Sequence, residues 1–313
     1  MTRPLISCRP HAFNRLGRAA LLAATLAPGL AGCGYIKGKA IGMVGETLAS
    51  GGDTFTRDDD PDLVGQALPF ALKLYESLLD ATPKDTHLLV ATCAAFTQYG
   101  YAFVQTEAEK ADVTNHDEGK RLQDRAFRLF QRGKGFCIRA LELRFPGIGP
   151  KLIQDPRPAL MQAKKSDVEL LYWSAASWGL AIGLQTDLAI DLPSVRVLAE
   201  RALALDEAWH NGALHELMIT LESGGEIVGG SEARARMHFA RAVELQHGLS
   251  PSPYIALAMG VSVANQQRAE FEDLMRKAIA ADPEKDPSDR LVILMAQARA
   301  RWQLDHIDAL FAK

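Results

Sequence analysis

The sequence predicts an all-α protein in which helical hairpins stack side by side into a superhelix. Apolar residues recur at helical spacing, and one stripe of this kind comprises Phe271, Leu274, Met275, Ala278 and Ile279. The alternating apolar and polar segments between turn pairs that predict strands do not occur. A short phrase of a basic residue, alanine and an aliphatic residue also returns along the chain. Together these observations favour repeated helix pairs.

The first 32 residues have the pattern of a secretory signal peptide. Four arginines precede an apolar run over residues 19–30, which is shorter than the ~20 residues of a membrane-spanning helix. The run ends at Leu30-Ala31-Gly32-Cys33, which is similar to the bacterial lipobox, where the cysteine becomes the lipid-bearing first residue. We therefore expect a lipoprotein acylated at Cys33. The alternative is an ordinary secretory signal with a chance cysteine.

Acyl chains at Cys33 would hold the mature chain at a membrane surface, because each buried CH₂ contributes about 0.8 kcal/mol. Gly34 follows the cysteine. It takes the place of the aspartate that typically retains lipoproteins in the inner membrane of Gram-negative bacteria. We expect a periplasmic protein anchored to the outer membrane.

Residues 33–60 are predicted to form a lipid-anchored N-terminal segment that links the anchor to a helical domain over residues 61–313. Residues 36–49 can form a short helix, which its glycines weaken. An acidic run from Asp58 to Asp62 then surrounds Pro61, a pattern that predicts a helix N-terminus. The run lacks the spacing and closing glutamate of a calcium-binding EF-hand, so no metal site is expected there.

The returning phrase identifies the repeat. It begins at Arg139, Arg201, Arg241 and Lys277, and the later intervals lie near the ~34-residue period of tetratricopeptide repeats (TPRs). Its small alanine would let neighbouring helices approach closely, and Pro83, Pro146 and Pro283 each follow soon after a predicted helix end. We expect about four TPR-like pairs with flanking helices, each covering the apolar face of the next. Residues 88–105 and 170–184 are rich in alanine and aromatic residues and predict buried helices.

Charge and cysteine content limit the function classes. The net charge is −3, and removal of the leader takes away four arginines, so nucleic-acid binding is not expected. Cys93 and Cys137 remain in an oxidising compartment, where a disulfide and two buried thiols are both open alternatives.

Motifs for catalysis do not occur: the chain contains no G-x-S-x-G, P-loop or H-E-x-x-H sequence, so we expect neither an enzyme nor a cofactor or metal. His210 and His215 are five positions apart, and on a helix they would not share a face. Glu216, in an apolar segment, is the least implausible acid of a cell-wall hydrolase.

The most distinctive stretch runs from Gly224 to Ala258. Two glycine pairs flank residues 226–228, and Ser231 is placed to cap a helix that begins at Glu232. Such a glycine loop can bind an anion through backbone N–H groups, or it can serve as a tight connection between repeats.

This stretch, "VGGSEARARMHFARAVELQHGLSPSPYIALA", resembles the TatT component family of tripartite ATP-independent periplasmic (TRAP) transporter systems. The resemblance extends over residues 187–311, including the A-R-A-R-W word at 298–302, and more loosely over "DDDPDLVGQALPFALKLYESLLDATPKD". The family-signature positions in this chain are Gly229, Gly230, Ser231, His238, Phe239, Ser252, Pro253 and Tyr254. The chain departs from the pattern at Glu207-Ala208-Trp209, where Asp-Pro often follows the helix, and this puts the local turn in doubt.

The resemblance implies a periplasmic TPR lipoprotein that associates with a TRAP solute-binding protein, forms a homotrimer and encloses a ligand-accommodating channel. We expect it to bind a small, partly hydrophobic organic solute without chemistry. Candidate channel-lining residues are Trp173, Trp178, His210, His215 and Tyr254. The alternatives are a scaffold lipoprotein for envelope assembly without a solute site, which an open concave face would favour, and a cell-wall hydrolase.

Overall fold

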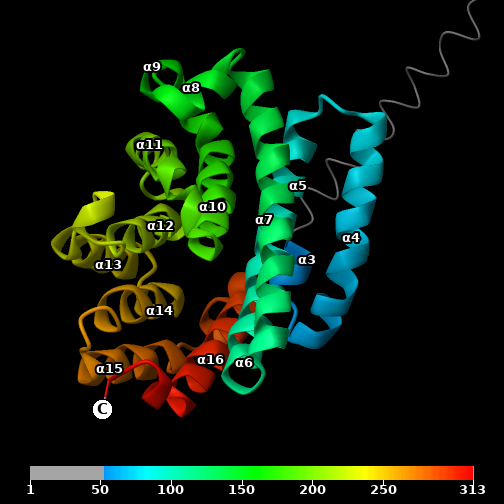
Figure 1. Cartoon of the computed structure of the whole chain (residues 1–313). Helices are drawn as coiled ribbons and strands as arrows, with labels where there is room; N and C mark the ends of the chain where they lie inside the picture. Colours follow the sequence, from blue (N-terminus) through cyan, green and yellow to red (C-terminus); the bar gives the residue numbers. More distant parts are fainter. Residues whose placement is uncertain (1–52, 313) are drawn as a thin grey trace, which may run out of the picture.

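A computed structural model of the chain describes residues 53–312 (Figure 1). The described part is helical and contains no strand, which confirms the predicted fold class. Cys33 and the helix predicted over residues 36–49 lie outside the described residues. The α-helices are α3 (Asp53–Thr56), α4 (Pro61–Ala81), α5 (Thr86–Tyr99), α6 (Thr106–Thr114), α7 (His116–Arg144), α8 (Ile148–Gln154), α9 (Arg157–Leu160), α10 (Val168–Leu184), α11 (Leu192–Leu205), α12 (Ala213–Glu222), α13 (Glu232–Leu245), α14 (Ser252–Leu257), α15 (Arg268–Ile279) and α16 (Arg290–Asp305).

Helix α4 begins where the acidic run predicted it. The Asp60 carboxylate accepts a hydrogen bond of 3.0 Å from the backbone N–H of Leu63, and Pro61 occupies the first turn. This cap satisfies one of the N–H groups that have no partner within the helix. The helix ends at Ala81, shortly before Pro83.

Helices α5, α7 and α10 pack against one another and form the first part of the superhelix (Figure 1). A disulfide joins Cys93 of α5 to Cys137 of α7, which decides between the two alternatives that the sequence left open. Gly133 permits the close approach of these helices, since a Cβ there would lie 2.9 Å from Oγ1 of Thr97. A π-helical turn over Gly100–Gln105 connects α5 to α6.

The remaining helices form hairpins in sequence order: α10 with α11, α12 with α13, and α14 with α15. The returning phrase falls at the C-terminal ends of α7, α11, α13 and α15. Its alanines have no exposed surface, as the prediction of close helix approach requires; they are Ala140, Ala202, Ala242 and Ala278.

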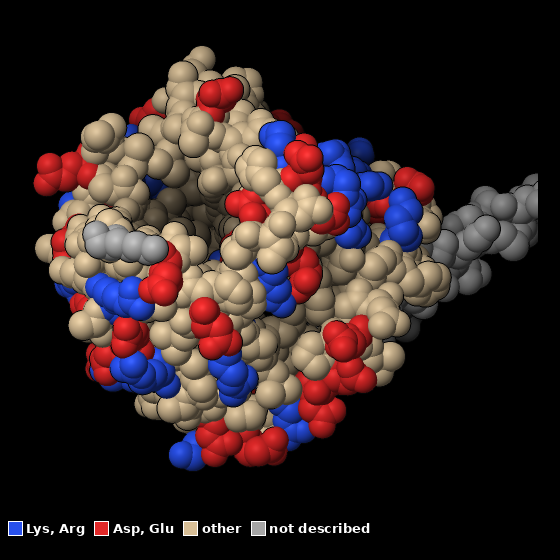
Figure 2. Space-filling model, turned by 60° about the horizontal axis from the view of Figure 1, so that its bottom comes forward, with Lys and Arg blue, Asp and Glu red and all other residues tan. Residues whose placement is uncertain are grey.

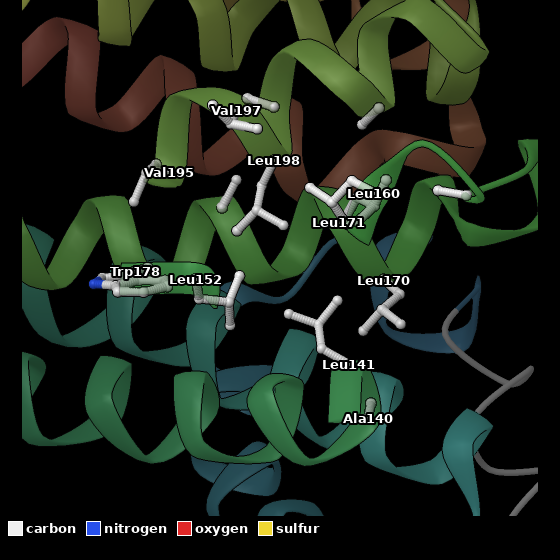
Figure 3. Packing of buried hydrophobic residues seen from close by; sticks show 14 of the residues in the cluster. Ala140, Leu141, Leu152, Leu160, Leu170, Leu171, Trp178, Val195, Val197 and Leu198 are labelled. Atoms are coloured by element: carbon white, nitrogen blue, oxygen red, sulfur yellow. The ribbon is translucent and has the colours of Figure 1, made fainter. Parts of the chain in front are cut away.

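A continuous apolar cluster holds the first hairpins together (Figure 3). Leu198 of α11 lies over α10. It belongs to the same cluster as Leu171 of α10, and both side chains are fully buried. Burying a leucine of this kind stabilises the fold by roughly 1.5–3 kcal/mol. A second cluster includes residues of every helix from α12 through α16, and a third lies between α4, α5, α7 and α10.

The superhelix turns far enough for its two ends to meet. Helix α16 packs against α3 and α4, and its Arg299 contacts α6 (Figure 1). The described helices therefore form a closed ring, and a deep hollow is visible within it (Figure 2). None of the described helices combines the length and the apolar character that a membrane span requires.

Candidate functional site

A pocket of about 220 Å³ lies at the start of α12. The connection between α13 and α14 and the start of α16 form the rest of its lining. We call it the central pocket. It is lined by His210, Asn211, Ala213, Glu216, Leu245, Gln246, His247, Leu249, Ser250, Ser252, Asp286, Asp289 and Val292.

Two left-handed turns shape the wall of the central pocket. His210 and Asn211 have φ angles of 43° and 53°, and Gly212 follows at 89°. On the other wall His247, at 54°, precedes Gly248 at 69°. Histidine and asparagine tolerate this region better than most residues, but they still carry strain of order 1–3 kcal/mol. The segment over 208–212 is thus a turn, and the helix expected to carry both His210 and His215 begins only at Ala213.

Glu216 is the central ionisable group of the pocket. The Nε2 group of Gln246 donates a hydrogen bond to its carboxylate. Burial raises the pKa of Glu216 to about 7, and the charge of Asp289 acts in the same direction, whereas the Gln246 hydrogen bond opposes it. This carboxyl group can therefore be neutral or charged near physiological pH.

Three aromatic side chains, which we call the aromatic trio, pack against one another and reach the pocket wall at His210. The ring centroid of Tyr172 lies 4.9 Å from that of Trp173 and 4.7 Å from that of Trp209. Trp209 in turn lies 4.3 Å from the ring of His210 in the pocket wall. Burial raises the pKa of Tyr172, and the charges of Glu216 and Tyr101 raise it further. The hydroxyl of Tyr172 therefore stays protonated.

Arg299 closes the ring where α16 meets α6. It donates to Glu109 of α6, with an Nη2–Oε1 distance of 2.7 Å, and to the hydroxyl of Tyr101 in the π-helical turn. Its guanidinium also lies 5.1 Å from the Tyr101 ring centroid. Burial by itself would lower the pKa of Arg299, but Tyr101 and Glu109 outweigh this effect and raise it. The side chains of Arg299 and Glu109 are 13% and 26% exposed, so the pair is largely desolvated.

A buried histidine pair joins α12 to α13. The Nδ1 atoms of His215 and His238 are 2.8 Å apart, which requires one nitrogen to donate and the other to accept. Burial lowers the pKa of both rings; at His238 the neighbouring His215 lowers it further, and at His215 the carboxylate of Glu207, 3.5 Å from Nε2, partly opposes the effect. His215 is thus buried against another helix.

The glycine stretch forms the tight connection between α12 and α13. Gly229 has a φ of 78°, and a Cβ on Gly230 would lie 2.3 Å from the carbonyl oxygen of Glu222. Ser231 caps α13 by accepting from the N–H of Arg234, as the sequence predicted. Burial disfavours ionisation of Glu222, but hydrogen bonds from Arg234 and Arg196 outweigh it and lower its pKa. Glu222 at the end of α12 thus forms ion pairs with Arg196 and Arg234 beside this connection.

The other signature residues pack α13 against α14. The rings of Phe239 and Tyr254 meet edge to face, with centroids 5.5 Å apart. Pro253 is buried in the first turn of α14. Of the eight signature residues, only Ser252 lines the central pocket.

The five candidate channel-lining residues are separated by the fold. His210 lines the central pocket, and Trp173 belongs to the aromatic trio. Trp178 lies in the core, where its indole N–H donates to Asp191 over 3.0 Å. His215 and Tyr254 make the helix–helix contacts just described.

Sequence reasoning did not find Tyr172, Gln246 or the Arg299–Glu109 pair. Arg299 does lie in the A-R-A-R-W word, but nothing in the sequence names its partner 190 residues away. Among residues 53–312, no group of three or more histidine, cysteine or acidic side chains is arranged to hold a metal ion.

Comparison with known proteins supports the resemblance seen in the sequence. A family model described as "TRAP transporter T-component" matches residues 57–311. An uncharacterized protein of Treponema pallidum (strain Nichols) is 29% identical over 266 residues, which cover 82% of this chain and 82% of the relative.

Proposed function

The chain belongs to the TRAP transporter T-component family, and from this membership we propose that it docks a TRAP solute-binding protein and holds a small organic solute in the central pocket. The protein would bind and pass on the solute without chemistry. The pocket would receive the solute from the partner or return it, while the helical ring provides the docking face.

The closed ring is the observation that carries this proposal. An open concave face would favour a scaffold, whereas here α16 returns to α6 through the Arg299–Glu109 pair. The central pocket combines apolar lining residues, among them Leu245, Leu249 and Val292, with a few polar groups. Small-molecule sites commonly have this composition.

We further propose that the protein is a lipoprotein, anchored through Cys33 to the periplasmic face of the outer membrane and assembled as a homotrimer. Lipid attachment would confine it to a surface and raise its effective concentration toward partners there. Metabolic labelling with an alkyne-bearing fatty acid tests the anchor. Label should be incorporated by the wild-type chain and not by Cys33→Ser.

Titration with the purified solute-binding protein of the organism's own TRAP system tests the docking role. We expect saturable binding with a defined stoichiometry by isothermal titration calorimetry, and native mass spectrometry of the complex should detect retained solute. A chain that binds neither the partner nor any small molecule would favour the scaffold alternative.

One observation keeps the cell-wall hydrolase as a second candidate. Glu216 has a pKa of about 7 and lies near Asp289. Glycoside hydrolases commonly pair a carboxylic acid of raised pKa with a second carboxylate. Peptidoglycan turnover in cells that carry Glu216→Gln distinguishes the two functions. Turnover equal to that of wild-type cells excludes the hydrolase.

A further inference from the structure

The wall of the central pocket has a one-sided charge. Three of its described residues are carboxylic, namely Glu216, Asp286 and Asp289, and none of the described lining residues is lysine or arginine. The nearby Arg290 donates to Glu284, outside this lining, over 2.6 Å. Asp289 makes a further contact within the protein, and Glu216 and Asp286 supply the remaining negative charge of the lining. An anionic ligand would therefore meet repulsion, and a cation would meet attraction.

An unpartnered acceptor adds a second, independent indication. Gln246 lines the pocket and is only 9% exposed, and its Oε1 atom has no hydrogen-bond partner among residues 53–312. Its Nε2 group is engaged by Glu216, so the amide is held in place. A buried acceptor without a donor costs roughly 1–3 kcal/mol, which a ligand N–H group would recover. Ammonium groups offer only donors, as this wall requires.

Apolar side chains of the lining provide a surface for the rest of such a ligand; they are Leu245, Leu249 and Val292. Their burial against an apolar body contributes in proportion to the area removed from water. The pocket volume of about 220 Å³ equals roughly seven water molecules at ~30 Å³ each, which suits a small organic molecule.

We propose that the central pocket binds a small organic cation, an ammonium group on an apolar body, with Glu216 and Gln246 as the acceptors of its N–H groups. This inference rests on the proposed function and specifies its solute class. The carboxylates select the charge, and Leu245, Leu249 and Val292 accommodate the apolar part.

Three probes test the charge preference: benzylammonium, benzyl alcohol and benzoate. All three carry the same phenyl ring, and they differ in charge. Isothermal titration calorimetry on the purified protein at pH 8 should give benzylammonium at least tenfold tighter binding than either of the others. Glu216→Gln keeps the shape of the side chain and should weaken benzylammonium at least tenfold while leaving benzyl alcohol unchanged. Glu226→Gln, an exposed glutamate in the α12–α13 connection, is the matched control and should change neither.

The affinity for benzylammonium should also depend on pH. Glu216 faces Tyr172 from α10, Gln246 after α13 and Asp289 before α16, while His210, His247 and Asp286 complete the titratable lining. Because the ionised form of Glu216 is the acceptor, binding should strengthen between pH 6 and pH 8. The Glu216→Gln variant should lose most of this increase.

Equal affinities for the three probes, a preference for benzoate, or no binding of benzylammonium would overturn the cation proposal. Displacement of benzylammonium by an equal concentration of calcium chloride would also overturn it, by indicating a metal site. Each of these results leaves the docking proposal standing if the TRAP solute-binding protein still binds. We expect Glu216→Gln to retain that partner, so the two proposals can fail separately.

Discussion

At the scale of single residues, this protein buries ionisable groups in two different ways. Glu222 and Arg299 are buried with charged partners, so they stay ionised. For Glu216, His215 and His238 burial is the largest influence on the pKa, and it shifts each group toward its uncharged form. The first kind joins helices, and the second makes the protein respond to pH.

The histidine pair should make stability fall in mild acid. Both histidines have lowered pKa values in the folded protein, so the unfolded chain, with values near ~6.5, binds more protons. The contribution is therefore complete above about pH 6.5 and is lost as pH falls below that value. Urea unfolding at pH 7.5 and 5.5 should show a smaller loss of stability for His238→Gln than for wild type.

His87→Gln is the control for this measurement, because His87 is exposed at the start of α5. It should keep the wild-type difference between the two pH values. A His238→Gln variant with the full wild-type difference would contradict the assignment of the pH response to the pair.

Gly230 should tolerate no side chain. Its Cβ would lie 2.3 Å from a backbone oxygen of Glu222, so Gly230→Ala must displace the α12–α13 connection, and we expect a loss of about 1–3 kcal/mol in the free energy of unfolding. In Gly135→Ala the new Cβ, in the middle of α7, meets no atom of the described part of the chain within 4 Å, and helix propensity predicts a gain of roughly 0.5–1 kcal/mol. Chemical denaturation of both variants checks the prediction, and equal effects would refute it.

At the scale of helices, much of the structure was predictable because the signals are local. The cap at Asp60, the cap at Ser231 and the apolar stripe of α15 depend only on residues within one or two turns. The buried alanines of the returning phrase are also local, since each marks one helix end. The left-handed turn at His210 and Asn211 was missed, because neither residue type requires a positive φ.

The disulfide between α5 and α7 should contribute substantially to stability. It closes a loop with a sequence separation of 44 residues, for which chain entropy predicts roughly 4 kcal/mol, and measured effects are commonly 2–4 kcal/mol. Thermal unfolding with and without dithiothreitol should show a lower midpoint for the reduced protein. The Cys93→Ala/Cys137→Ala variant should match the reduced wild type and be insensitive to dithiothreitol; a midpoint that the reductant leaves unchanged would contradict the prediction.

At the scale of the whole molecule, the curvature of the helical stack determines which residues come together at the site. Each hairpin adds a small rotation to the last, and the sum of these rotations brings α16 back to α6. The sequence predicts the hairpins but not this sum, so the Arg299–Glu109 and His215–His238 pairs could not be read from it. The central pocket could not be predicted for the same reason, although Glu216 and His210 were candidate residues on chemical grounds.

Closure of the ring should depend on Arg299. Arg299→Met keeps an apolar stem but leaves Glu109 without its cation, and the loss of one partner from a buried pair costs about 3–5 kcal/mol. Arg276→Met breaks an exposed pair with Glu272 on α15 and should cost at most about 1 kcal/mol. Denaturant unfolding of the two variants provides the comparison. Losses of similar size would mean that the ends of the ring are held by apolar packing alone.

Hydrogen–deuterium exchange on the chain with and without its TRAP solute-binding protein tests most directly whether the interior of the ring is the functional surface. The account predicts slower exchange around the central pocket, at residues 208–216, 246–252 and 284–292, when the partner and its solute are present. Protection confined to the outer faces of α4 and α7, with no change at the pocket, would contradict it.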